Sequence, residues 1–357
     1  MARAIRLAER GRYSTPPNPC VGCVLVRDGK VVGEGWHRRA GGPHAEVIAL
    51  EMAGERSRGA ACYLSLEPCV HHGRTPPCTE ALIRAGVSRV VCAHADPNPR
   101  VSGKGLERLR QAGVEVHCGL LEAEARRLNP GFIRRMTRGL PLVRLKLAMS
   151  LDGRTAMASG ESQWITSPQS RADVQRLRAG SGAVLTGIGT VLADDPALTV
   201  RDPRFDTAGR QPLRVVLDSG LRTPPDCQLL GEPGPVLICT CSRDRQARER
   251  LERAGAAVVT LPGEERIDLH AVLRELAGRE VNTVLVEAGA TLAGAFVGAG
   301  LVDELILYQA PKLLGEAARG LLQLPALERL EQAPRLEVTD LRRVGPDWRV
   351  TARPKED

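Results

Sequence analysis

The pattern of apolar and polar positions predicts alternating strands and helices in the first third of the chain. Two apolar runs flank Asp28-Gly29, a dipeptide typical of a tight hairpin turn. Strands separated by helices of about ten residues indicate a mostly parallel sheet covered by helices. The expected strands lie at 21–26, 30–36, 61–66, 89–94 and 114–118, and the expected helices run from Pro43 to about Gly54, from Cys78 to Ala85 and near 103–112.

A helical pattern over 120–139 ends at Gly139 and Pro141, and the succession of strands then begins again. We therefore expect two α/β domains, at 1–140 and 141–357. The last three apolar runs of the chain predict antiparallel strands. The expected strands of the second domain lie at 143–150, 183–190, 213–218, 235–240, 256–261, 283–290, 301–309, 335–344 and 347–354.

The composition is that of a globular chain without a membrane span. Of the 357 residues, 43% are hydrophobic and 26% are charged, and no apolar run reaches the roughly 18 residues that a spanning helix needs. The N-terminus lacks the uninterrupted apolar core of a secretory signal. Several of the ten cysteines lie in strand-like runs, as Cys62, Cys92 and Cys239 do. We therefore expect buried, reduced thiols and a cytoplasmic location.

The formal charge of +8 comes mainly from arginine. A nucleic-acid-binding surface would carry such an excess, but the chain has only three residues each of Trp, Tyr and Phe and no block of lysine or arginine. We favour a small anionic ligand, such as a phosphate ester, over nucleic acid.

Two segments, GGPHAEVIAL (41–50) and LEPCVHHGRTPPC (66–78), carry side chains typical of a metal site. His44 and Cys78 lie where two predicted helices begin, and Cys69 follows a predicted strand, so all three are expected at one point. Helix N-termini favour thiolate over thiol. Three protein ligands with an open fourth position are typical of a catalytic zinc site, whereas a structural site has four.

Glu46 is the candidate proton carrier beside this zinc. Pro43 suits the first position of a helix, which places both His44 and Glu46 in the first turn. Zinc lowers the pKa of its bound water to about 7, and hydrolysis of an amino group also needs a group that moves a proton from water to departing ammonia. H-x-E followed by P-C is the pattern of zinc-dependent deaminases, although eight residues separate the two cysteines here instead of two.

Alternatives to this ligand set remain at this stage. His71 or His72, in the segment between the cysteines, could replace one of the ligands, and a cysteine-rich loop without metal is a further interpretation. Cys20 and Cys23 form a second C-x2-C, which we interpret as structural because it opens an apolar strand.

The second half lacks both the G-x-G-x-x-G fingerprint and the P-loop pattern, so an ordinary Rossmann domain or kinase is not supported. Two apolar runs instead end in glycine-rich turns, TGIGTVLADDP (186–196) and EAGATLAGA (287–295). Glycine lets backbone approach a ligand, and a following helix N-terminus presents N–H groups to phosphate. A plain tight turn is an equally good interpretation of each.

Polar residues near these turns extend the candidate site. Ser162 can hydrogen-bond, and Trp164 can stack on a flat ring. Arg178 and Arg201 are candidates for a ribose phosphate, since guanidinium matches phosphate geometry. Each arginine has an alternative interpretation as a solvated surface residue.

Taken together, these motifs closely resemble the bacterial RibD-type family of riboflavin-biosynthesis bifunctional deaminase/reductases, and the resemblance covers nearly the whole chain. Two positions depart from it: Val70 replaces a usual serine, and Cys20 takes the variable place of an N-P-x-V-G motif. The segments that carry the resemblance are PHAEVIAL, LEPCVHHGRTPPC, DPNPRVSGKGLERLRQAGVEV, LKLAMSLDGRTAMASGESQWITS, GIGTVLADDPALTVR, VEAGATLAGAF and VDELILYQAPKLLG.

The resemblance implies a cytidine-deaminase-like first domain and a dihydrofolate-reductase-like second domain. The first would hydrolyse the 2-amino group of 2,5-diamino-6-(5-phosphoribosylamino)pyrimidin-4(3H)-one, with His44, Cys69 and Cys78 as zinc ligands and Glu46 as proton donor. The second would use NADPH to reduce the ribosyl group to ribityl, with Lys146 and Asp194 best suited to polarise or protonate the ribose carbonyl.

The resemblance also implies the lining of the reductase site. The substrate would contact Ser162, Arg178, Leu198, Arg201 and Glu287. NADPH would contact Ala148, Trp164, Thr190, Asp194, Ser219, Gly289, Ala290, Thr291, Leu292, Ala293, Gly294 and Ala295.

Two other functions compete with this one. A nucleic-acid (tRNA) deaminase shares the His, Glu and Cys chemistry, but it has no use for a second domain with cofactor-type loops and would offer more stacking aromatics. A zinc-stabilised binding protein would need no proton carrier such as Glu46. We expect the chain to form a homo-oligomer through its second domain.

Overall fold

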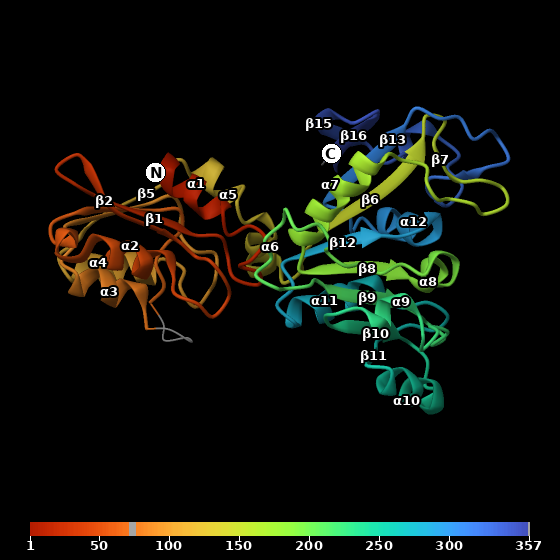
Figure 1. Cartoon of the computed structure of the whole chain (residues 1–357), viewed down its shortest axis with the longest axis horizontal. Coiled ribbons are helices and arrows are strands. Elements are labelled where there is room, and N and C mark those ends of the chain that lie inside the picture. The colour runs from red at the N-terminus through yellow and green to blue at the C-terminus, as the bar shows by residue number, and fades with distance from the viewer. Residues whose placement is uncertain (71–75, 356–357) are drawn as a thin grey trace. The chain divides into compact units, whose positions relative to one another are not determined.

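The computed structural model describes residues 1–70 and 76–355 and divides the chain into two compact units (Figure 1). Residues 1–140 form the first unit together with 206–209, and residues 141–205 and 210–357 form the second. No helix in the described ranges is long and apolar enough to cross a membrane.

The first unit is a five-stranded sheet with helices on both faces. Its strands follow the order β2-β1-β3-β4-β5. The elements are α1 (Ala2–Glu9), β1 (Gly22–Arg27), β2 (Lys30–Trp36), α2 (Ala45–Ala53), η1 (Gly54–Ser57), β3 (Ala61–Leu64), α3 (Cys78–Arg84), β4 (Arg89–Cys92), α4 (Lys104–Gln111), β5 (Glu115–Cys118), α5 (Glu122–Arg126) and α6 (Pro130–Arg138).

The prediction of a mostly parallel first sheet is only half right. The pairs β3–β4 and β4–β5 are parallel, whereas β1 runs antiparallel to both β2 and β3. The two-residue turn at Asp28-Gly29, which can join only antiparallel neighbours, accounts for the first of these two pairs. Asp28 itself has a positive φ of 52°, as such a turn demands.

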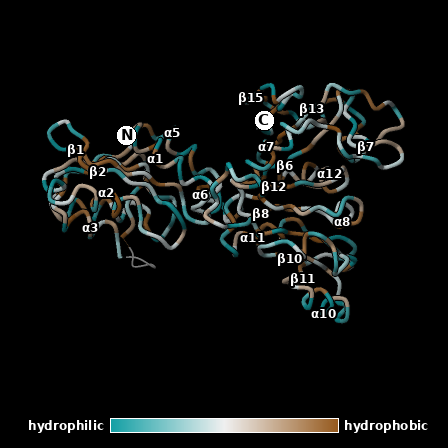
Figure 2. Tube along the Cα trace, in the orientation of Figure 1, coloured by the Kyte–Doolittle hydropathy of each residue, from teal (hydrophilic) through white to brown (hydrophobic). Residues whose placement is uncertain are grey.

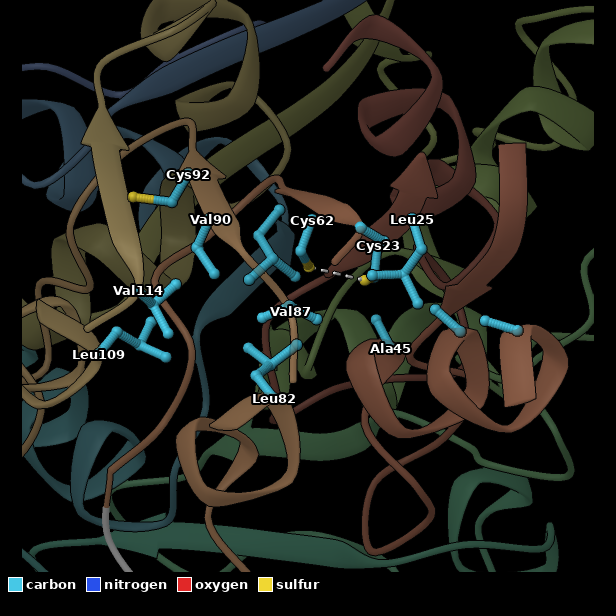
Figure 3. Close-up of a cluster of buried hydrophobic side chains, with 14 of the residues drawn as sticks. Cys23, Leu25, Ala45, Cys62, Leu82, Val87, Val90, Cys92, Leu109 and Val114 are labelled. Atoms are coloured by element: carbon cyan, nitrogen blue, oxygen red, sulfur yellow. Dashed lines mark hydrogen bonds between the residues drawn. The ribbon is translucent and has the colours of Figure 1, made fainter. Parts of the chain in front are cut away.

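A continuous apolar core lies between the sheet and α2, α3 and α4, which cover one face in Figure 1, while α1 and α5 lie on the other. Figure 3 shows the core side chains converging from the strands and α3, with the Cys23 and Cys62 sulfur atoms 3.5 Å apart. Cys20 is also buried, so both members of the second C-x2-C serve packing. All ten cysteines are described, and all are free thiols.

Two helix predictions need correction. The single helix expected over 120–139 is two helices, α5 and α6, because Pro130 starts α6 and cannot continue a preceding helix. Helix α2 begins at Ala45 with His44 as its N-cap, so Pro43 precedes the helix instead of opening it. Glu46 still lies in the first turn.

The second unit is built on a nine-stranded sheet of order β11-β10-β9-β8-β12-β6-β13-β16-β15. Its elements are β6 (Leu142–Ser150), β7 (Arg154–Ala156), α7 (Pro168–Ala179), β8 (Ala183–Gly187), α8 (Ile188–Asp194), β9 (Leu213–Leu217), α9 (Gln228–Gly231), β10 (Val236–Thr240), α10 (Arg245–Arg253), β11 (Ala257–Thr260), α11 (Leu269–Gly278), β12 (Thr283–Glu287), α12 (Ala290–Gly298), β13 (Glu304–Ala310), β14 (Arg319–Gly320), η2 (Leu330–Gln332), β15 (Leu336–Val344) and β16 (Asp347–Pro354).

The pairing of this sheet separates a parallel body from an antiparallel end. Every pairing from β11 through to β13 is parallel, and β13–β16 and β16–β15 are antiparallel. Figure 2 shows hydrophobic colour along the inner strands, whereas α10 at the periphery is largely hydrophilic. Parallel strands buried on both faces read as continuous apolar runs, as β8, β10 and β12 do.

The strand ends of this sheet define the candidate reductase region. The runs expected as strands at 183–190 and 283–290 stop being strands at Gly187 and Glu287, and the helices α8 and α12 follow. Since β8 and β12 are parallel neighbours, both helices begin at the same edge of the sheet. In open α/β sheets that edge is where ligands bind.

Candidate functional site

The first unit brings His44, Cys69 and Cys78 together, as the sequence predicts. Their ligand atoms all lie within 4.8 Å of one another. His44 Nδ1 is 3.1 Å from Cys78 Sγ and 3.6 Å from Cys69 Sγ. A tetrahedral zinc with Zn–S of about 2.3 Å and Zn–N of about 2.0 Å holds such atoms roughly 3.5–3.8 Å apart, so the donor set fits zinc in both chemistry and spacing.

Local backbone contacts place the two cysteines. The start of α3 is fastened to the turn that carries Cys69: the Cys78 N–H donates to Cys69 Sγ, and the Thr79 N–H and hydroxyl both donate to the Cys69 carbonyl. The helix N-terminus therefore points at a ligand sulfur, where its partial positive charge favours the thiolate. His71 and His72, the alternative ligands, lie outside the described residues.

The pKa values of the two cysteine thiols are shifted in opposite directions. The hydrogen bond with the Cys78 side chain lowers the pKa of Cys69, assisted by His44 and opposed by burial. The same bond, together with burial, raises the pKa of Cys78. Cys69 is thus ready as a thiolate, and a divalent cation supplies the charge needed to deprotonate its neighbour as well.

The Glu46 side chain is buried beside the three predicted zinc ligands. Its Oε2 is shielded from solvent and has no hydrogen-bond partner among the described residues. Burial raises the pKa of the Glu46 carboxyl, and the nearby His44 only partly offsets this. A carboxyl group with a raised pKa and a free oxygen at a three-ligand metal site suits proton transfer.

Two further residues of this site escaped the sequence analysis. His37, at the end of β2, contacts the Pro43 carbonyl through Nδ1 at 3.0 Å, and its ring meets that of His44 edge to face with centroids 5.3 Å apart. Asp96 is buried after β4, and burial raises its pKa to about 6. The segments GWH and ADPNP carry both residues at strand ends, which is the only local signal for them.

In the second unit, Lys146, Arg178 and Glu287 form one largely buried charged cluster. Lys146 and Glu287 are paired in register on β6 and β12, with Nζ 3.9 Å from Oε2. Arg178 reaches Glu287 from α7 with two hydrogen bonds of 2.6 and 3.0 Å and donates a third to the Thr199 carbonyl. Ala148 follows Lys146 by two positions and lies on the same face of β6.

The charges of this cluster are unequal, with two cations for one anion. Burial alone would raise the pKa of Glu287, but Arg178 and Lys146 hold it below its ordinary value. Burial lowers the pKa of Lys146, and Glu287 only partly restores it. The net positive charge favours an anionic ligand, and the lowered pKa makes Lys146 a better proton donor near neutral pH.

Three further predicted residues, Ser162, Asp194 and Trp164, make side-chain contacts in the second unit. Ser162 Oγ donates to Asp194 Oδ1 at 3.3 Å, linking its loop to the last residue of α8. Trp164 is 61% exposed, and the Arg171 guanidinium lies 4.5 Å from its ring centre. A ring with so much open surface is available for stacking.

Helix α12 presents the predicted phosphate-type terminus, but two of its predicted contact residues, Ala293 and Gly294, are buried. Gly289 is its N-cap and lies beside Thr190, whose Oγ1 is 4.0 Å from where a Cβ on Gly289 would be. Ala293 and Gly294 are buried, and a Cβ on Gly294 would come within 2.1 Å of the Gln323 carbonyl. These two residues pack the helix and expose no surface for a cofactor to contact.

Three predicted contact residues do not join the charged cluster. The Leu198 side chain packs in the core with α7 and β13, so only its backbone is available, with φ of 52°. Arg201 is exposed, and its N–H donates to Gln175 Oε1. Ser219 follows β9, and its carbonyl accepts from the Thr240 hydroxyl.

Comparisons with known proteins match both units. The description "cytidine and deoxycytidylate deaminase zinc-binding region" matches residues 1–94, and "RibD C-terminal domain" matches residues 141–350. The riboflavin biosynthesis protein RibD of Escherichia coli (strain K12) is 55% identical over 356 residues, which cover 97% of this chain and 96% of that protein.

Solved structures agree over the whole chain. Acinetobacter baumannii RibD superposes with a TM-score of 0.93 at 46% identity, covering 99% of this chain and 97% of that one. A diaminohydroxyphosphoribosylaminopyrimidine deaminase/5-amino-6-(5-phosphoribosylamino)uracil reductase from Thermotoga maritima gives a TM-score of 0.87 at 36% identity, covering 99% and 97%.

The donor geometry predicts which substitutions release zinc. Cys78→Ser should weaken zinc binding by at least about 100-fold, since a hydroxyl is a poor substitute for a thiolate. Glu46→Gln should retain one zinc per chain, because Glu46 is not among the ligands. Zinc content after dialysis against a chelator measures both, with Cys118→Ser, at an exposed cysteine outside the cluster, as the control. Full retention by Cys78→Ser would contradict the ligand set.

Proposed function

Since the chain belongs to the RibD family of bifunctional riboflavin-biosynthesis enzymes, we propose that its two units perform successive steps on one phosphorylated pyrimidine. The chain is a zinc-dependent deaminase and a reductase that uses NAD(P)H, with a cytidine-deaminase-like and a dihydrofolate-reductase-like domain. RibD enzymes act on phosphoribosylamino pyrimidines. We assign deamination to residues 1–140 and reduction to 141–357.

Under this proposal the first substrate is 2,5-diamino-6-(5-phosphoribosylamino)pyrimidin-4(3H)-one, which loses its 2-amino group as ammonia. The second step reduces the ribosyl group with NADPH and gives 5-amino-6-(5-phosphoribitylamino)uracil. The observation that carries the proposal is the three-ligand cluster with the buried Glu46 carboxyl beside it. A structural zinc site would use four ligands and no such carboxyl.

Glu46 moves the proton in the deamination. Zinc, when bound, supplies a nucleophilic water at neutral pH. Glu46 takes a proton from that water and delivers it to the departing amino group, a transfer for which its free Oε2 is available. Its raised pKa lets it hold the proton between the two transfers.

Lys146 is our candidate proton donor in the reduction. NADPH supplies the hydride to the open-chain ribose carbonyl carbon. Lys146, largely buried and of lowered pKa, then protonates the carbonyl oxygen, while Glu287, itself bound by Arg178, holds the ammonium in place. Asp194, the other candidate, is exposed and engaged with Ser162, so we assign it to the cofactor side of the site.

We extend the proposal to the remaining predicted contacts with the substrate and with NADPH. The N–H groups of the first turn of α12 have no acceptor inside the helix and suit the cofactor phosphates. The backbone of Leu198 and the exposed Arg201 border the substrate, and Ser219 borders the cofactor. Trp164 offers the exposed ring for stacking. Both substrates carry phosphate, which accounts for part of the arginine excess.

These findings count against the two competing functions. A nucleic-acid deaminase leaves the second unit unexplained, whereas the RibD match extends across 97% of the chain. A zinc-stabilised binding protein has no use for Glu46.

A two-stage assay tests the proposed order of reactions. The purified protein is given the diaminopyrimidine ribose phosphate without cofactor, and ammonia is measured, after which NADPH is added and its absorbance followed. We expect ammonia first and NADPH consumption second. Glu46→Gln should release no ammonia, yet it should consume NADPH when given the deaminated intermediate. Ammonia without NADPH consumption would refute the reductase half of the proposal.

The charged cluster predicts a reductase-specific defect. Lys146→Met should lower the reductase kcat by about 100-fold or more, the scale of a lost general acid, and leave ammonia release unchanged. Arg144→Met is the matched control, because Arg144 is a paired cation on the same face of β6 but outside the cluster. Equal reductase losses in both variants would show that Lys146 has no special role.

We also propose that two copies pair through the second unit and that the enzyme is cytoplasmic, as its ten free thiols favour. Strand β15 forms the outer edge of the nine-stranded sheet. Val338 and Leu341 on it are 57% and 59% exposed. An edge strand with exposed apolar side chains offers a contact surface to a second copy of the chain.

Pairing through β15 predicts a monomeric variant. Leu341→Glu should halve the mass measured by sedimentation velocity, because it places a charge on the contact surface. Leu120→Glu makes the same change at an exposed leucine of the first unit and should leave the mass unaltered. A wild-type protein that sediments as a monomer would overturn the proposal.

A further inference from the structure

Glu67 is a buried acid that neither proposed reaction uses. Its side chain lies between the end of β3 and the start of α4, and the residue is 3% exposed. Oε2 accepts the backbone N–H groups of Asp96 and Gly103, both at 2.9 Å, and Oε1 accepts those of Gly105 at 2.9 Å and Leu106 at 3.3 Å. One carboxylate thus receives four backbone donors.

Within the described part of the chain, Glu67 is the only hydrogen-bond acceptor found for these four N–H groups. Gly105 and Leu106 belong to the first turn of α4, where N–H groups have no acceptor within the helix. The N-cap of α4 is Gly103, which has a positive φ of 87° and no side chain to cap the helix. Glu67 therefore caps α4 from a distant part of the sequence, and its negative charge lies at the positive end of that helix.

The turn that carries Glu67, Pro68 and Cys69 also lies directly against segment 94–106. The Glu67 N–H donates to the His94 carbonyl at 3.0 Å. A Cβ on Gly105 would come within 2.2 Å of the Pro68 carbonyl, so only glycine permits this approach. Cys69, a zinc ligand, is the next residue after Pro68, and Asp96 lies close enough to Cys69 for the two charges to interact.

We propose that Glu67 is a positioning residue of the deaminase site, whose carboxylate holds segment 94–106 against the zinc-binding turn. The segment carries the buried Asp96, so Glu67 fixes this residue relative to the turn that carries the zinc ligand Cys69. Zinc binding needs only His44, Cys69 and Cys78, none of which contacts the Glu67 carboxylate in a described hydrogen bond. This inference rests on the proposed deaminase function.

Glu67→Gln tests the role, because an amide keeps the shape but can accept at only one of its two positions. The full-length variant should keep one zinc per chain and normal reductase kinetics. Its deaminase kcat/KM should fall by roughly 10- to 100-fold, the usual effect of removing a partner that orients a metal site. Amide hydrogen exchange of segment 94–106 should become faster at a temperature well below unfolding.

Glu80→Gln is the matched control. Glu80 also contacts α4, through a half-exposed ion pair with Arg108 at 2.9 Å, yet it holds no backbone N–H group in a described hydrogen bond. This variant should match wild type in ammonia release, zinc content and exchange. Gly105→Ala provides an independent second variant, since it forces the segment away from Pro68 with the Glu67 carboxylate intact, and it should show the same deaminase-specific defect.

Three results would overturn the proposal. They are unchanged deaminase kinetics in Glu67→Gln, zinc loss in proportion to the lost activity, and unfolding of the first unit in both variants, which would make the role purely structural. Failure of the deaminase assignment itself is distinguishable. The wild-type enzyme would then release no ammonia, while hydrogen exchange would still report whether Glu67 holds the segment.

Discussion

A charged group that leaves water for a protein interior is tolerated only where other polar groups replace the lost hydration. Both units of this enzyme bury charge at the ends of sheet strands and meet that condition in different ways. The Cys69 sulfur accepts a backbone N–H group and belongs to the predicted zinc site. The Glu67 carboxylate accepts four backbone N–H groups. The Glu287 carboxylate is paired with Arg178 and Lys146. The surrounding helices are arranged so that these partners reach the charges.

The sheets make this arrangement possible. Parallel strands end at a common edge, and each following helix begins there with unpaired N–H groups. In the first unit β3 and β4 end beside the metal cluster, and in the second β8 and β12 lead into α8 and α12. The antiparallel additions, the β1–β2 hairpin and the β15–β16 pair, extend the sheets without supplying a zinc ligand or a member of the reductase charge cluster.

The capacity of Glu46 and Lys146 to transfer protons depends on how completely neighbouring groups stabilise their charged forms. No group among the described residues hydrogen-bonds to the buried Oε2 of Glu46, and the carboxyl has a raised pKa, so it can receive a proton. Lys146 is opposed by a second cation, Arg178, and has a lowered pKa, so it can give one up. Under the proposed mechanism, one chain thus holds a proton acceptor and a proton donor in separate units, which suits a hydrolysis followed by a reduction.

The sequence by itself determined the zinc ligands, the place of Glu46 in the first turn of a helix and most strands, because these depend on local spacing and on apolar runs that hold in any tertiary context. It did not determine that Arg178 binds Glu287, 109 residues away, that the Leu198 side chain is in the core, or that Glu67 caps α4. Those partners are fixed by which strands lie side by side and how helices pack on them. Strand order is a property of the whole chain's burial, and no single segment encodes it.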